Sequence, residues 1–192
     1  MVAIDGRQAR TLWTGLGLGS LAIFSGVVLL LVTGLREEAL RDGLRVKAES
    51  VIETVYHEGG REAAKTTTDG AFLLCVRAQQ AFVAYGVLTL VLTTVGLIFG
   101  RNLATLRLGT IFIGIGAILH PAHLLVAGWL APSLGSTALA IDRVQWLAQV
   151  GAWSLVGGSL FVMCDLMVSA WQCRNRKSSQ PATLNSLVSE RL

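Results

Sequence analysis

Two histidines in the longest uncharged run of the chain are the residues best placed to do chemistry. His120 and His123 lie three positions apart in the run Leu119-His120-Pro121-Ala122-His123, so their imidazoles share one face of a helix. Pro121 removes a backbone donor and is expected to bend the helix there. Polar side chains on neighbouring segments are expected at a similar depth, which gives a candidate pocket lined by Arg77, Gln80, His120, His123, Gln145 and Gln149.

Three interpretations of this pocket are open. Neutral imidazoles bind transition metals, so His120 and His123 are candidate metal ligands, with His57 or Glu58 folding down as a third. The same residues could instead bind a small molecule, a lipid headgroup or a quinone. The third interpretation is a hydrogen-bond network between helices that only satisfies buried polar groups.

Two familiar metal sites fit the sequence poorly. Haem b needs two axial histidines that approach the iron from opposite faces, whereas His120 and His123 lie on one helix. The segment beginning at His57 starts like the zinc-protease motif H-E-x-x-H, but Arg61 stands where the second histidine is required. The sequence therefore offers no catalytic constellation.

The elements that position these residues follow from the distribution of charge. Of the 192 residues, 53% are hydrophobic and 15% charged, whereas a soluble domain carries roughly 25% charge. Uncharged runs of 21 to 34 residues occur four times, and a helix needs about 20 apolar residues to cross a bilayer. The sequence therefore predicts an all-α integral membrane protein, a single membrane domain with four transmembrane helices in a bundle. The expected spans are 12–34, 78–100, 104–130 and 145–169.

Half of the charged side chains lie in the polar segment 36–69 between the first two spans. Leu40, Leu44, Val51 and Val55 form an apolar stripe in this segment, which predicts an amphipathic helix over about 36–57. This helix would lie on the membrane or over the bundle, or serve as a docking surface for a partner. Residues 66–70 are expected to form the loop before the second span, and residues 174–192 a flexible tail.

Arg107 and Asp165 are each expected about one helical turn inside a span, near the membrane face that holds both termini. A charge at the centre of a membrane helix costs about 2.5–3.5 kcal/mol, and pairing lowers this cost. Because the third and fourth spans run antiparallel, the two side chains are predicted to form a structural ion pair. A proton relay is the alternative.

Small residues recur at helical spacing in the first and fourth spans. They are Gly15, Gly19, Ala148, Gly151, Ser154 and Gly158. Helices in lipid gain no hydrophobic drive from meeting, so small residues let their backbones approach closely. These positions are expected to pack the bundle together, or to contact a second copy or a partner subunit.

The orientation prediction depends on the basic residues that flank the spans. Lysine and arginine are equally numerous on the two sides, but the side that holds both termini is shorter and carries fewer acids. This favours cytoplasmic termini in a plasma membrane or bacterial inner membrane. The basic isoelectric point, about 9.3, comes from these flanking arginines, so no nucleic-acid partner is expected.

Together these features favour an accessory, assembly or structural subunit without catalysis of its own. It would work in the lipid bilayer as a homo-oligomer or within a larger membrane complex. The alternative is a metal- or small-molecule-binding membrane protein, for transport or as a redox accessory, that uses the pocket around His120 and His123. The cofactor is not identified by the sequence, and a transition metal is the candidate.

Overall fold

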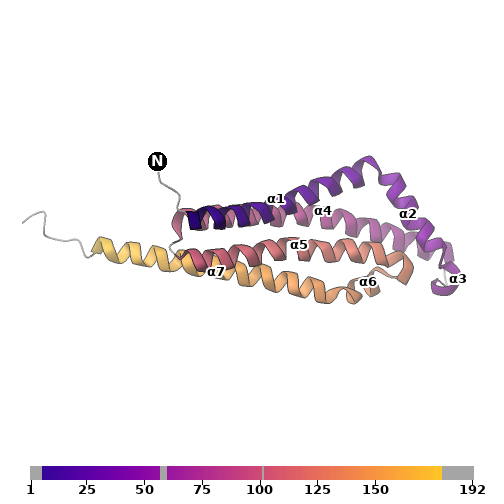
Figure 1. The fold of residues 1–192 in the computed structure, drawn as a ribbon. Coiled ribbons are helices and arrows are strands. Elements are labelled where there is room, and N and C mark those ends of the chain that lie inside the picture. Colours follow the sequence, from indigo (N-terminus) through magenta and orange to yellow (C-terminus); the bar gives the residue numbers. More distant parts are fainter. Residues whose placement is uncertain (1–5, 57–59, 101, 179–192) are drawn as a thin grey trace, which may run out of the picture.

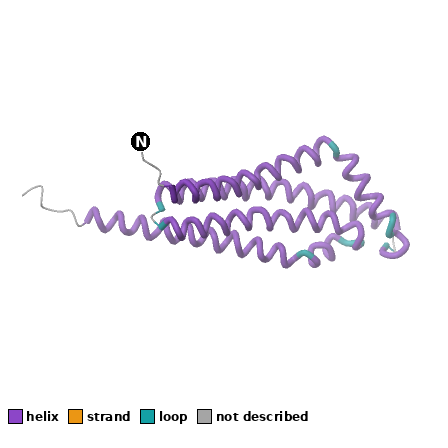
Figure 2. Tube along the Cα trace, viewed as in Figure 1, coloured by secondary structure: helices purple, strands orange, loops and turns teal. Residues whose placement is uncertain are grey.

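The computed structural model describes residues 6–56, 60–100 and 102–178; it is 94% helical and has no strand in this part of the chain. The helices are α1 (Gly6–Leu35), α2 (Glu37–Glu49), α3 (Ile52–Val55), α4 (Gly60–Phe99), α5 (Leu103–Leu134), α6 (Thr137–Arg143) and α7 (Gln145–Ser178). The long helices α1, α4, α5 and α7 run side by side, and the short ones lie at one end (Figure 1). The connections are short turns at the helix ends (Figure 2).

The four long helices are each long and apolar enough to cross a membrane, in agreement with the four predicted spans. The candidate spans are Trp13–Leu35, Gly60–Phe99, Ala104–Leu134 and Gln145–Gln172. Large apolar side chains cover their outer faces; Phe24 and Trp153, for example, are 66% and 75% exposed. The helix α7 continues to Ser178, so the first residues of the predicted flexible tail are helical, and the rest of that tail lies outside the described residues.

The helix that contains the second predicted span begins well before position 78, because α4 already starts at Gly60. The predicted loop over residues 66–70 was wrong. The hydroxyls of Thr66 and Thr68 donate to carbonyls four residues earlier at 3.0 and 2.8 Å, so these side chains are satisfied within a helix. A helix of 40 residues is about 60 Å long. The helix α4 therefore extends well beyond the roughly 30 Å of a hydrocarbon layer.

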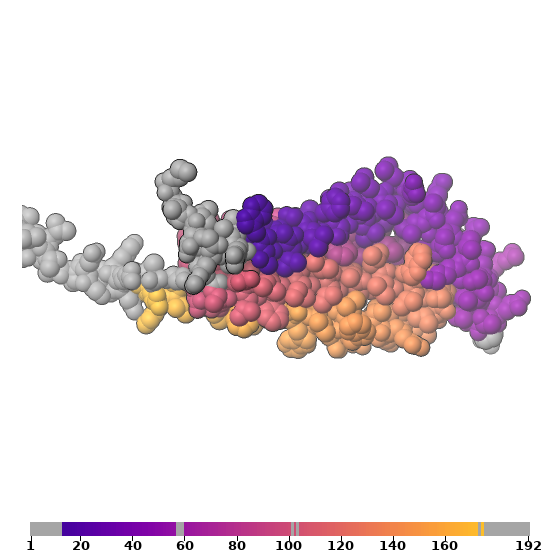
Figure 3. Space-filling view, viewed as in Figure 1, coloured from indigo at the N-terminus to yellow at the C-terminus, as the bar shows by residue number. Residues whose placement is uncertain are grey.

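The helix predicted over 36–57 is divided in the structure. The helix α2 ends at Glu49, and α3 begins at Ile52 after a turn. Leu44 is fully buried, as the stripe predicted, but Val55 is exposed because the break at the turn rotates it out of line. Space-filling atoms show the α2–α3 segment, in purple, covering one end of the molecule (Figure 3).

The helix α5 is the central element of the long helices. It packs extensively against α4 and α7 and also contacts α1, whereas α4 and α7 touch each other little. Of the most apolar 18 residues of α5, 44% are buried inside the protein, against 22% for α1 and for α7. The core along α5 includes Leu106, Ile113 and Ala117, with Val162 from α7 and Phe82 from α4.

A second core joins α2, α3 and α6 to the ends of α4 and α5. Three hydrogen bonds reinforce it. The Tyr56 hydroxyl donates to the Pro132 carbonyl at 2.8 Å, and Lys47 Nζ donates to the Trp129 carbonyl at 2.8 Å. The Thr67 hydroxyl donates to the carbonyl of Gly135 at 3.3 Å, where a left-handed φ of 72° ends α5. Burial raises the pKa of the Tyr56 phenol and lowers the pKa of Lys47.

Candidate functional site

His120 and His123 lie together on the central helix, in the half nearer to α6. The helix α5 continues through Pro121, which is buried. The two imidazole centroids are 5.0 Å apart, and His123 Nδ1 contacts the backbone carbonyl of His120. His123 is buried. Of the two imidazoles, only that of His120 lines the space between α4 and α7.

His120 contacts both neighbouring helices. Its Nδ1 lies 3.5 Å from the Ala148 carbonyl on α7. On the other side, the Tyr85 ring of α4 meets the His120 imidazole edge to face, with centroids 5.4 Å apart and an interplanar angle of 79°. His120 therefore stands where α4, α5 and α7 come together.

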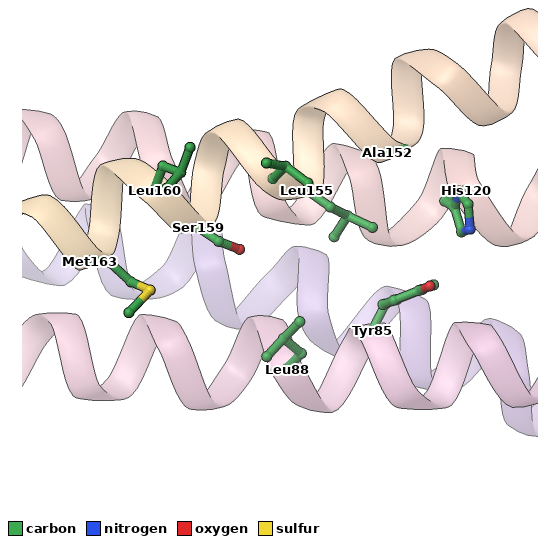
Figure 4. A pocket seen from close by; sticks show the side chains of 9 residues that line it. Tyr85, Leu88, His120, Ala152, Leu155, Ser159, Leu160 and Met163 are labelled. Atoms are coloured by element: carbon green, nitrogen blue, oxygen red, sulfur yellow. The ribbon is translucent and has the colours of Figure 1, made fainter.

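A groove of about 420 Å³ runs from this point between α4 and α7. Its lining is apolar apart from one imidazole and two hydroxyls, and consists of Tyr85, Leu88, His120, Ala152, Leu155, Val156, Ser159, Leu160 and Met163. Figure 4 shows Ser159 and Met163 pointing from α7 toward α4, where Leu88 rises toward them and Tyr85 leans toward His120. The volume lies within the roughly 300–1,000 Å³ typical of ligand sites.

Glycines explain why this space is left between the helices. A Cβ added at Gly151 would lie 2.6 Å from the His120 backbone nitrogen, and one at Gly158 would lie 2.7 Å from the Gly109 carbonyl oxygen. These glycines let α7 press closely onto α5. The side chains that α7 then turns toward α4, such as Ala152 and Ser159, are too small to fill the distance.

The other predicted packing residues also lie at contacts within the chain. Cβ atoms at Gly15 and Gly19 would clash with Thr93 and Leu90 of α4. Ala148 provides the carbonyl that faces His120, and Ser154 is half-buried on α7. The structure therefore uses the predicted glycines where α1 meets α4 and α7 meets α5.

Only part of the predicted pocket is brought together. The side chains of Arg77, Gln80, Gln145 and Gln149 are exposed, and none of them lines the groove, which takes only His120 from the predicted set. Sequence reasoning missed Tyr85 and Ser159. Tyr85 did carry a signal, since a tyrosine deep in an apolar run presents a hydroxyl that needs a partner.

The metal hypothesis has two of its three ligands in place. His120 and His123 are adjacent, but no group of three histidine, cysteine, aspartate or glutamate side chains suited to a metal occurs within residues 6–56, 60–100 and 102–178. His57 and Glu58, the proposed third ligands, lie outside the described residues.

The structure does not bring Arg107 and Asp165 together in the way the sequence suggested. Among the described residues the ion pairs are Arg41 with Glu37, Arg41 with Asp69 and Arg45 with Glu49. Leu106 turns into the core beside Gly96, which directs the next residue, Arg107, outward.

Asp165 is buried instead at the start of α5. Its Oδ1 accepts from the Asn102 backbone N–H at 3.1 Å. Asn102 is itself the cap of α5, and its side chain accepts from the backbone N–H groups of Ala104 and Thr105. The positive end of the α5 dipole therefore stabilises the Asp165 carboxylate.

In comparisons with known proteins, no family model, no curated protein and no solved structure matches the chain.

Proposed function

We propose that the four long helices form a transmembrane bundle and that α2 is an amphipathic helix over one of its ends. The burial pattern of α2 supports this arrangement. Leu44 and Ala48 are fully buried, while Glu38, Asp42 and Arg45 on the same helix are exposed.

Within that bundle, the protein acts as an accessory, assembly or structural subunit without catalysis of its own, and its working surface is the groove between α4 and α7. The observation that carries this proposal is the open, apolar hollow at the level of the spans, whose only polar lining groups are His120, Tyr85 and Ser159. Among the residues that the structure describes, no charged side chain lines it, so it is suited to hold a hydrophobic molecule. Binding a metal at His120 and His123 is the less supported form of ligand binding, because only two ligands come together in the described part of the chain.

Native mass spectrometry of the protein purified in mild detergent tests this role. We expect a bound mass on the wild-type chain that is lost in Ser159→Phe, because the larger ring occupies the groove. The matched control is Val150→Phe, on the same helix at an exposed position that does not line the groove. If the wild-type chain and both variants carried the same bound mass, the groove would not be the binding surface and this part of the proposal would be wrong.

The partner expected from the sequence, a second copy of the chain or a larger membrane complex, belongs to the same proposal. Its interface would use surfaces other than Gly15, Gly19, Gly151 and Gly158, since these meet neighbouring helices of the same chain. Blue-native electrophoresis of solubilised membranes is expected to give a band larger than one chain. Migration as a single chain in several mild detergents would contradict a subunit role.

We place the protein in a plasma membrane or bacterial inner membrane, with cytoplasmic termini. The basic residues of the terminal side are concentrated in fewer residues than those of the other side, which supports this orientation. Labelling of single cysteines at Ser178 and at Arg61 with a membrane-impermeant maleimide, in intact cells, is expected to modify only the second position.

A further inference from the structure

We infer that the groove between α4 and α7 binds an amphiphile with one apolar chain and a carbonyl or hydroxyl head, taken from the leaflet on the α2–α3 side. This inference rests on the proposed role of the groove and names the class of molecule that fills it. Three observations carry it: polar groups with unused hydrogen-bonding capacity, the place of His120 and Tyr85 at one end of the groove, and the direction of the groove across the membrane.

The polar lining groups have hydrogen-bonding capacity that the protein leaves unused. Neither the Tyr85 hydroxyl nor the Ser159 hydroxyl is hydrogen-bonded to another described residue. Ser159 differs in this from Thr89 and Thr93 of α4, whose hydroxyls donate at 2.7 Å to carbonyls one turn earlier. Inside a bilayer no water is available to satisfy such groups, so a ligand that pairs with them is favoured.

These groups suit a neutral head with acceptor oxygens. The Tyr85 hydroxyl can donate to such a head, and the His120 ring can pair with it as donor or acceptor. Ser159, by contrast, lies about 10 Å beyond Ala152 along α7. No charged side chain lines the groove to balance a charged head. A carbonyl or hydroxyl head, as in an acyl ester or a quinone ring, therefore matches the lining better than a free phosphate would.

The position of the polar end matches an amphiphile that enters from one leaflet. Trp146 and Trp171 are 63% and 65% exposed and lie about 37 Å apart along α7, so they mark the two membrane interfaces. His120 packs against Gly151, roughly 7 Å below Trp146. The polar end of the groove therefore lies just under the interface on the α2–α3 side.

The apolar remainder of the groove follows the membrane normal. Its lining on α7 extends from Ala152 to Met163, a rise of about 16 Å, or about half of the hydrocarbon thickness. Leu88, Leu155, Val156 and Leu160 line the length between these ends, and the Ser159 hydroxyl is its one polar group among the described residues. A single chain that descends from the His120 end reaches the membrane midplane inside the groove.

Two sources supply this chemistry, and separate probes distinguish them. Delipidated full-length protein is titrated with 1-oleoylglycerol, which has one acyl chain and an uncharged ester head, in one series and with decylubiquinone in another, and 1:1 adducts are counted by native mass spectrometry. We expect one probe to saturate as a 1:1 adduct and Ser159→Phe to weaken it at least tenfold, with Val150→Phe unchanged. Tyr85→Phe keeps the ring and removes one donor, so we expect affinity to fall about fivefold.

The possible outcomes separate this inference from the role proposed above. Suppose that neither probe forms an adduct that is lost in Ser159→Phe, while the native protein still carries another mass that is lost in this variant. In that case the groove remains the working surface, and the inference that it binds an amphiphile is wrong. A photoreactive amino acid placed at position 160 tests for a partner helix. If it crosslinks to a polypeptide and no lipid adduct forms, the inferred amphiphile is replaced by a partner helix. If no mass depends on Ser159 in native or reconstituted protein, both proposals fall.

Discussion

The contact of Gly158 with α5 allows a direct test of the packing that creates the groove. A Cβ at Gly158 would lie 2.7 Å from both the Gly109 carbonyl oxygen and the Ile113 backbone nitrogen. These are backbone atoms, so rotation of a side chain cannot relieve the overlap. The neighbouring Gly157 has nothing within 4 Å of the same added atom, which makes it a matched control on the same turn.

The geometry sets the size of the effect. To reach an ordinary contact of 3.4 Å, α5 and α7 must separate by roughly 0.7 Å, and a gap of about 0.5–1 Å forfeits a quarter to a half of each lost dispersion contact. Overpacking a close contact typically costs about 1–3 kcal/mol. Both substitutions gain the same helix propensity from Gly to Ala, so the difference between them isolates the packing cost.

Thermal unfolding in detergent, followed by circular dichroism, measures this difference. We expect Gly158→Ala to melt about 2–12 °C below Gly157→Ala, from roughly 2–4 °C per kcal/mol for a chain of this size. The Gly157→Ala variant should melt at or slightly above the wild-type temperature. Equal melting temperatures for the two variants would refute close packing of α7 on α5 at this position.

Three further changes are expected to alter stability in the same assay. Asn102→Ala removes the side-chain cap of α5 and should cost about 1 kcal/mol, while Asn102→Ser, an uncharged cap, should restore most of it. Tyr56→Phe leaves a buried carbonyl without its donor and should cost about 1–3 kcal/mol. Burial raises the pKa of Tyr56. The stabilisation by its neutral phenol is therefore fully present below about pH 10 and is lost as the pH rises through the raised pKa. If Tyr56→Phe left the pH dependence of the melting temperature unchanged, this assignment would be contradicted. Arg41→Ala breaks two ion pairs and a contact 4.1 Å above the Phe72 ring, so it should cost about 1 kcal/mol, whereas Arg45→Ala, which breaks one exposed pair, should cost about none.

Several features of the site were within reach of the sequence and others were not. The spacing of His120 and His123 predicted adjacent imidazoles, because residues three apart on a helix share a face. Their neighbours could not be predicted in the same way, since Gln80 and Tyr85 belong to one helix and only its rotation decides which of them meets His120. The structure turns Tyr85 to His120 and leaves Gln80 exposed.

The sequence by itself determined the four apolar helices, because the length of an uncharged run decides locally whether a helix can cross a bilayer. It did not determine where α4 begins, since the threonines at 66 and 68 suit a loop as well as a helix that satisfies their hydroxyls. Tertiary packing also decided the partner of Asp165 and the groove between α4 and α7. Both depend on how far apart the helix backbones lie and how each helix is rotated, and these quantities are set only when the faces of all four helices pack together.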